Sequence, residues 1–65
     1  MQLIINGKEQ DCHATTVQEL LAELGLAGKP VVCELNTVII PAEKLAQTKL
    51  APNDRLELVQ FVGGG

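Results

Sequence analysis

The residues best suited to chemistry stand at the end of the sequence, Gly63-Gly64-Gly65, directly after an apolar segment. Glycine loses more conformational entropy on folding than any other residue, so three in succession do not serve to stabilise a fold. Because they lack Cβ atoms they can pass through a narrow channel, and the last four residues reach roughly 13 Å when fully extended. This pattern predicts a slim chain end that enters the active site of a second protein.

Gly65 would present a carboxylate to that site. A carboxylate is substituted only after it has received a leaving group, and we find no segment in this sequence that could supply one. We therefore expect a second protein, using a nucleotide, to activate Gly65, so that this chain carries a chemical group and is not itself an enzyme. The glycines could instead be a frayed end or the remnant of a fusion.

Cys12, His13 and Cys33 are the other residues whose types could do chemistry. Neighbours in a strand point to opposite faces, so Cys12 and His13 would not converge on one metal ion, and a structural zinc site needs four ligands. His13 has no nucleophile or carboxylate at a recognisable spacing that would make it a catalytic base. We predict no metal or catalytic site, reduced thiols that fill the core, and a solvent-facing histidine.

Length and charge narrow the classes of function. A chain of 65 residues has room for one core, and a deep catalytic cleft would compete with it for the same residues. The net charge of −3 and the single aromatic residue, Phe61, argue against nucleic-acid binding and favour a basic partner surface. Without a signal-peptide pattern or a membrane-spanning run we expect no membrane association and a cytoplasmic location.

The first part of the chain predicts a hairpin and a helix. Residues 1–5 and 8–13 alternate as strands around Asn6-Gly7, the dipeptide suited to a type I′ turn. Thr16-Val17-Gln18-Glu19 has the form of a capping box. Apolar residues then follow at helical spacing until Gly25, which predicts one amphipathic helix of two to three turns.

The second part predicts three more strands. Residues 31–36 form a strand with alternate residues facing inward, and 38–40 form a short strand that Pro41 ends. Between residues 42 and 50 there is space for one helical or 3₁₀ turn, with Leu45 and Leu50 reaching the core. Residues 55–61 form the last strand.

This order of elements predicts an α+β domain in which a mixed sheet of four to five strands packs on one helix. With the first and last strands side by side at the centre, this is the β-grasp, or ubiquitin-like, architecture. We expect it to span residues 1–62, with residues 63–65 as a flexible tail. Apolar residues on the sheet face away from the helix would then come together as a partner interface beside the tail: Ile4, Val59, Phe61 and Val62.

The sequence as a whole resembles the ThiS family, the sulfur-carrier proteins of thiamine biosynthesis. The resemblance covers essentially the whole chain, and its most specific feature is the glycine end. Further matching positions, in order, are Met1 to Asn6, Thr16-Val17 with the leucines that follow, Glu34-Leu35-Asn36, Ile40-Pro41, Leu50, Asp54 and Val62 to Gly65.

The resemblance implies a cycle centred on the Gly65 carboxylate. A ThiF-type adenylating enzyme would use ATP and magnesium to form an acyl-adenylate there, while this chain itself binds no cofactor. Sulfur from a cysteine-derived persulfide would displace AMP and leave a thiocarboxylate. A ThiG-type thiazole synthase would accept that sulfur, with Gly64 allowing close approach of the backbone.

Three other interpretations are open at this point. The chain could carry sulfur for another product, as the small subunit of molybdopterin synthase or a carrier for amino-acid synthesis would. It could be a ubiquitin-like interaction module that is never activated. A small enzyme is the third possibility, although the sequence offers no catalytic constellation.

Overall fold

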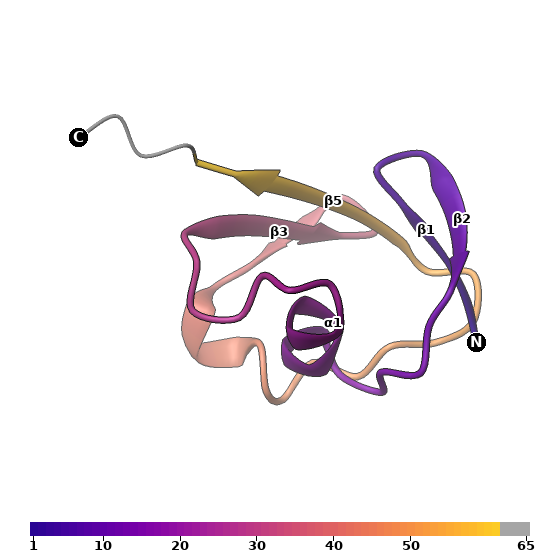
Figure 1. The fold of residues 1–65 in the computed structure, drawn as a ribbon, viewed down its shortest axis with the longest axis horizontal. Coiled ribbons are helices and arrows are strands. Elements are labelled where there is room, and N and C mark those ends of the chain that lie inside the picture. Colours follow the sequence, from indigo (N-terminus) through magenta and orange to yellow (C-terminus); the bar gives the residue numbers. More distant parts are fainter. Residues whose placement is uncertain (62–65) are drawn as a thin grey trace.

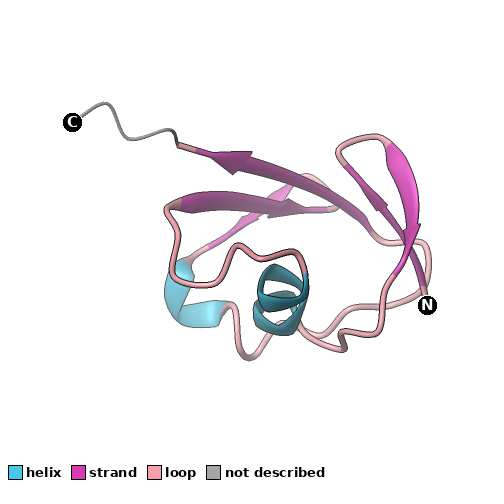
Figure 2. Cartoon of the chain, viewed as in Figure 1, coloured by secondary structure: helices cyan, strands magenta, loops and turns pink. Residues whose placement is uncertain are grey.

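The structure of this chain is a computed structural model, and it describes residues 1–61. Five strands form one mixed sheet, and both helical segments lie on the same side of it (Figures 1 and 2). In chain order the elements are β1 (Gln2–Ile5), β2 (Lys8–Asp11), α1 (Val17–Glu23), β3 (Val31–Leu35), β4 (Val38–Ile40), the 3₁₀ helix η1 (Ala42–Lys44) and β5 (Arg55–Gln60).

The strand order across the sheet is β2-β1-β5-β3-β4. The first and last strands of the chain are therefore neighbours at the centre, as expected, and they run parallel, whereas β5 and β3 run antiparallel. This arrangement of a mixed five-stranded sheet on one helix is the predicted β-grasp fold. It makes β5 the central strand, so the strand that leads to the glycines has neighbours on both sides.

Two tight turns connect the sequence-adjacent antiparallel strands, β1 to β2 and β3 to β4. Asn6 and Gly7 have φ angles of 50° and 82°, and Asn36 and Thr37 have φ angles of 50° and 74°. Positive φ at both central positions is the property of a type I′ turn, whose twist matches that of the flanking strands. The hairpin predicted at Asn6-Gly7 is confirmed, and a second turn of the same kind joins β3 to β4.

Helix α1 begins and ends on the residues that the sequence indicated. The Thr16 hydroxyl accepts a hydrogen bond from the Glu19 backbone N–H, and the Glu19 carboxylate accepts hydrogen bonds from the N–H and hydroxyl of Thr15. At the other end Gly25 has a φ of 77°, and Leu26 N–H donates to the Leu21 carbonyl at 2.7 Å. This is the Schellman arrangement, which satisfies the last carbonyls of a helix.

The core lies between α1 and the sheet. On the helix, Val17 and Leu20 are completely buried, and Leu21 is nearly so, because their spacing places them on one stripe. The loop after β4 closes the core from the side, with Leu50 buried and Leu45 packed against it, as predicted. The buried cluster comprises Leu3, Ile5, Cys12, Ala14, Val17, Leu20, Cys33, Leu50 and Leu56.

Strand β2 is shorter than the sequence suggested. It ends at Asp11 instead of His13, because the chain then turns inward to bury Cys12 and Ala14. The Glu23 carboxylate of α1 accepts hydrogen bonds from the backbone N–H groups of His13 and Ala14, which leave the ladder at this point. Neither helical segment in the described part of the chain has the length and apolar character needed to cross a membrane.

The side chain of Asn6 extends the pairing of β1 with β5 past the end of β1. Its Oδ1 accepts from the Leu58 backbone N–H at 2.8 Å, and its Nδ2 donates to the Leu58 carbonyl at 3.3 Å. These two bonds reproduce the pair of contacts that a strand residue would make. They hold β5 in place two residues beyond Leu56, whose carbonyl accepts from the Asn6 backbone N–H.

Replacing Asn6 by glycine should lower the free energy of unfolding by about 1–2 kcal/mol, because two partly exposed hydrogen bonds are lost while glycine accepts the positive φ without strain. Asn53→Gly is the matched control, since Asn53 also has a positive φ, of 70°, but no side-chain hydrogen bond among the described residues. Chemical denaturation of both variants measures the difference. Equal losses in the two would show that the Asn6 side chain contributes nothing.

Candidate functional site

The end of β5 is the part of the described structure nearest in sequence to the glycines. Five residues of β5 pair with β3, from Leu56 opposite Leu35 to Gln60 opposite Val31. One residue further, the Phe61 N–H donates to the Pro30 carbonyl at 3.0 Å, so the ladder reaches the last described residue. The base from which the glycines continue is therefore fixed to the sheet by backbone hydrogen bonds.

The glycines themselves, with Val62 before them, lie outside the described residues. The prediction that Gly65 carries the chemistry, with Gly63 and Gly64 as the tail, rests on the sequence. So does the expected division of the chain into a domain over residues 1–62 and a tail over 63–65.

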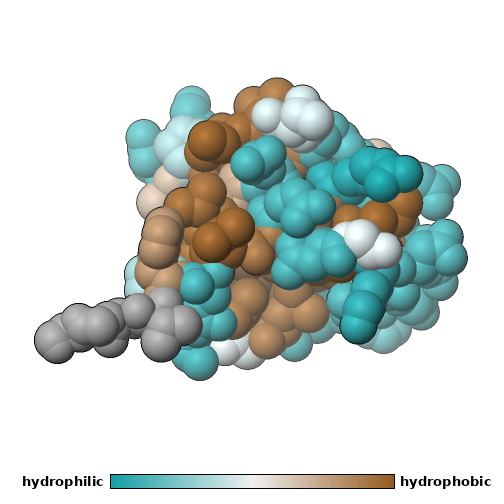
Figure 3. All heavy atoms as spheres, turned by 90° about the horizontal axis from the view of Figure 1, so that it is seen from above, coloured by the Kyte–Doolittle hydropathy of each residue, from teal (hydrophilic) through white to brown (hydrophobic). Residues whose placement is uncertain are grey.

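Apolar side chains gather on the sheet face away from α1, at the end where β5 stops. Val59 and Phe61 are 54% and 56% exposed on this face. Val32 lies directly opposite Val59, and Ile39, which is 62% exposed, lies on the same face of β4. Figure 3 shows this end of the outer face lined with hydrophobic side chains, next to a more polar remainder. We call Val32, Ile39, Val59 and Phe61 the outer patch.

Ile4 does not join the outer patch, so the expectation that it meets Val59 and Phe61 is wrong. The predicted pairing of β1 with β5 is present, but its register places Ile4 opposite Arg55. Val59 is four residues further along β5, which corresponds to roughly 13 Å at the rise of a strand. A role for Ile4 in contacting a partner stays a prediction, but it would be a separate contact.

The partner interface predicted from the sequence did not include Val32 and Ile39, although the alternation of side chains along a strand indicated that Val32 faces outward. An inward-facing Cys33 requires Val32 to face outward, because side chains alternate along a strand. The alternation does not say which residue of another strand stands beside it, however. Only the register of β3 with β5 shows that Val32 is the partner of Val59.

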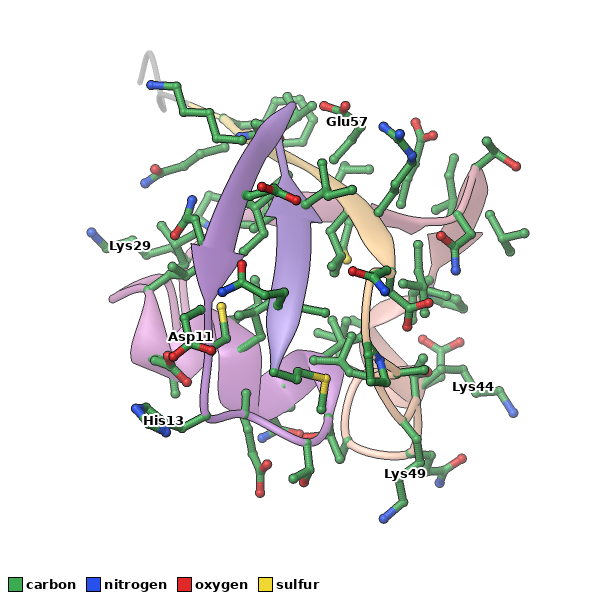
Figure 4. The ribbon with its side chains drawn as sticks, turned by 90° about the vertical axis from the view of Figure 1, so that its right-hand side faces the viewer. Asp11, His13, Lys29, Lys44, Lys49 and Glu57 are labelled. Atoms are coloured by element: carbon green, nitrogen blue, oxygen red, sulfur yellow. The ribbon has the colours of Figure 1, made fainter. Side chains whose placement is uncertain are left out.

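A pair of carboxylates lies next to the outer patch. Glu57 precedes Val59 by two residues on the same face of β5, and Glu34 stands directly opposite it on β3. Like charges directly opposite each other across two strands are unfavourable. In Figure 4, Glu57 projects from the sheet on the side remote from Lys44 and Lys49. The border of the outer patch is therefore acidic and would attract a basic surface.

Cys12 and Cys33 are core residues, as expected. They are 2% and 1% exposed, and both are free thiols. Burial raises the pKa of each thiol, and in each case a neighbouring carboxylate, Glu23 for Cys12 and Glu34 for Cys33, adds to the increase. Because the thiolate is the reactive form, neither cysteine is prepared to act as a nucleophile.

His13 is exposed and points away from the body of the domain beyond the end of β2 (Figure 4). Within residues 1–61, no three His, Cys, Asp or Glu side chains are grouped so that they could hold a metal ion. A shallow hollow at the start of α1 is lined by Thr16, Gln18, Glu19, Ala22 and Ala46. Its carboxylate, Glu19, is occupied by hydrogen bonds from Thr15, which lower its pKa.

Comparison with known proteins identifies relatives along the whole chain. The model of the ThiS family matches residues 3–65. The chain is 40% identical to the sulfur carrier protein ThiS of Bacillus subtilis over 65 residues, covering 97% of this chain and 98% of that protein. A crystal structure of the thiamine biosynthesis protein ThiS from Geobacter metallireducens superposes with a TM-score of 0.83, at 33% identity and complete coverage of both chains.

A second kind of relative is larger. The chain is 44% identical over 66 residues to a thiazole synthase of Paramagnetospirillum magneticum, and the match covers 100% of this chain. It covers only 20% of that synthase. This chain therefore spans about a fifth of the length of that relative.

Proposed function

The chain belongs to the ThiS family, the sulfur carrier proteins of thiamine biosynthesis, and we propose that the carboxylate of its Gly65 is the group that carries the sulfur. The observation that carries this proposal is the position of the glycines at the end of β5. That strand is the centre of the sheet and is held by backbone hydrogen bonds up to Phe61. A rigid body would thus direct the glycines toward a partner's active site.

The chemistry requires two partners before the sulfur is delivered. A carboxylate oxygen of Gly65 attacks the α-phosphorus of ATP in the site of a ThiF-type adenylating enzyme, and pyrophosphate leaves with magnesium as its counter-ion. The resulting acyl-adenylate is open to attack by the terminal sulfur of a persulfide, which displaces AMP and leaves an acyl disulfide. A second thiol then attacks the sulfur that came from the donor's cysteine, so that a disulfide leaves and the sulfur bound to the Gly65 carbonyl remains. The product of this sequence is a thiocarboxylate at Gly65, and this chain contributes the acyl group but no catalytic residue.

A ThiG-type thiazole synthase is the acceptor that we propose for the sulfur. The support is the thiazole synthase of P. magneticum, part of which matches this entire chain. We propose the cytoplasm as the place of this transfer.

Intact-mass spectrometry tests the proposal directly. The protein is incubated with a ThiF-type enzyme, ATP, magnesium, a persulfide donor and a thiol reductant, and its mass should rise by the difference between sulfur and oxygen. Omission of ATP should prevent the change. If the mass never changes although the ThiF-type enzyme binds the chain, then the protein is an interaction module and the proposal fails. Transfer of the sulfur to thiazole synthase but not to molybdopterin synthase would identify its destination.

We propose that the outer patch docks the body of the protein while the glycines enter the partner. Two features support this: the exposure of Val59, Phe61 and Ile39, and the acidic border formed by Glu34 and Glu57. Contiguous apolar surface of this kind is typical of a protein interface, and an acidic border would steer a basic partner surface toward it.

Val59→Asp should weaken binding to the ThiF-type enzyme at least about tenfold, because it places a charge in a desolvated contact. Val38→Asp is the matched control: Val38 is 60% exposed, is also a strand valine, and lies on the opposite face. Titration calorimetry measures both affinities, and the control should bind like the unmodified protein. Equal weakening by the two substitutions would show that the outer patch is not the docking surface.

A further inference from the structure

On one edge of β5 the main chain continues beyond the strand, β1, that pairs with it there. In an antiparallel pair the N–H and C=O groups of successive residues point alternately toward the partner strand and away from it. The Phe61 N–H points toward β3, because it donates to the Pro30 carbonyl, and the Asn36 N–H donates to the Arg55 carbonyl in the same ladder. Val59 lies between Arg55 and Phe61 in this alternation, so its main-chain groups also point toward β3. The N–H and C=O of Gln60 therefore point to the side of β1.

Strand β1 does not extend far enough to meet Gln60. Its pairing with β5 ends with Ile5 opposite Leu56. The backbone N–H of Asn6 then donates to the Leu56 carbonyl, and the Asn6 side chain takes both main-chain groups of Leu58. The hairpin turns back at Gly7, so within residues 1–61 no strand lies beside Gln60 on this side. Figure 1 shows β5 continuing past the β1–β2 hairpin with β3 along only one of its edges.

The glycines that follow Gln60 in the sequence indicate how a partner would bind at this edge. Gly63, Gly64 and Gly65 have no side chains, so a partner can recognise them only through their main-chain groups. Addition of a strand to a sheet edge is a mode of recognition in which main-chain hydrogen bonds supply the affinity. The open edge begins at Gln60, three residues before Gly63, the first of the residues that must be recognised in this way.

We propose that the adenylating partner inserts an extended segment of its own main chain alongside β5, on the side that β1 leaves open, with its first hydrogen bonds to the N–H and C=O of Gln60. The segment becomes an additional strand between the end of the hairpin and the glycines, and it guides Gly65 into the partner's site. The outer patch lies on the sheet face next to this edge, so Val59 and Phe61 would seat the body of the same partner. This inference rests on the proposed function, because it names how that partner holds the chain.

Amide hydrogen exchange measured by NMR tests the added strand without any substitution. In the free protein the Gln60 amide should exchange rapidly, whereas the Val59 amide, which points toward β3, serves as the slow internal reference. Addition of a ThiF-type enzyme should slow the exchange of Gln60 at least about tenfold. An unchanged Gln60 rate in the complex would overturn the proposal.

A second arm uses substitution. Gln60→Pro removes the N–H on the open side, where proline is tolerated in a strand because no ladder bond is lost. Gln60→Ala keeps the N–H and removes only the side chain, so it is the matched control. The proline variant should bind the ThiF-type enzyme about tenfold more weakly than the alanine variant, at similar melting temperatures. Equal affinities would contradict the added strand.

Two other outcomes also decide the matter. If the Gln60 amide is already protected in the free protein, and the protection grows with protein concentration, then a second copy of this chain covers the edge and the proposal is wrong. If the thiocarboxylate forms normally while Gln60 stays unprotected in the complex, then the added strand is refuted but the sulfur-carrier function stands. Failure of the function itself would instead appear as an unchanged mass.

Discussion

Conversion of the Gly65 carboxylate to an amide should abolish sulfur loading completely, because an amide oxygen does not attack ATP and no acyl-adenylate forms. Removal of Gly65 tests geometry instead of chemistry. The shortened chain still ends in a glycine carboxylate, but its reacting carbon is withdrawn by one residue, roughly 3.3–3.6 Å. A displacement of even 1 Å costs about a hundredfold in rate in a preorganised site, so we expect a loss of at least that size.

Neither amidation nor removal of Gly65 should change the fold or its stability. The buried cluster lies between Leu3 and Leu56, and the ladder of β5 with β3 reaches Phe61 without the glycines. Thermal unfolding should therefore give the same melting temperature for the unmodified, amidated and shortened proteins. Gly63→Ala is a useful companion, since it retains the length and the carboxylate and tests only the need for a bare backbone. A shortened protein that forms thiocarboxylate at the normal rate would refute the role of Gly65.

Leu20→Ala should lower the free energy of unfolding by about 2–5 kcal/mol, the range for removing a fully buried leucine and leaving a cavity. Leu20 is 0% exposed and belongs to the buried cluster between α1 and the sheet. A domain of this size has a total stability of roughly 3–10 kcal/mol, so the variant would lose a large part of it. Urea denaturation followed by circular dichroism measures the change.

Gln18→Ala on the exposed side of the same helix is the control for that experiment. It should change the stability by only a few tenths of a kcal/mol, because alanine is a good helix former and no core contact is lost. The comparison separates packing from helix propensity. Similar effects of the two substitutions would argue that α1 does not cover the sheet.

Sulfur loading should respond to the two kinds of change in different ways. Leu20→Ala acts on the body, so a cooled or osmolyte-stabilised sample should regain loading as the folded fraction recovers. The Gly65 changes act on the reacting group, so no stabilising condition should restore loading. This contrast allows the site to be distinguished from the scaffold in one mass-spectrometric assay.

The sequence alone was sufficient for the local structure, and the proposal for the reacting group rests on it. Asn6-Gly7 has few conformations other than the tight turn that was found, and Thr16 and Gly25 bound the helix through hydrogen bonds to residues within a few positions of themselves. These elements are predictable because each depends on neighbours in the chain. The glycines are recognisable for the same reason, since their property of having no side chain does not depend on the fold.

The tertiary structure decided which residues from distant parts of the chain stand beside each other. Alternation along a strand shows which face a residue occupies, but the register with another strand is set by burial of the whole core. For this reason Ile4 came to lie opposite Arg55, whereas Val32 lies opposite Val59. The hydrogen bonds of Asn6 to Leu58 span 52 residues, and the open edge at Gln60 exists only because β1 ends before it. No local pattern contains such information, because the free energy that selects one register is shared by contacts across the entire sheet.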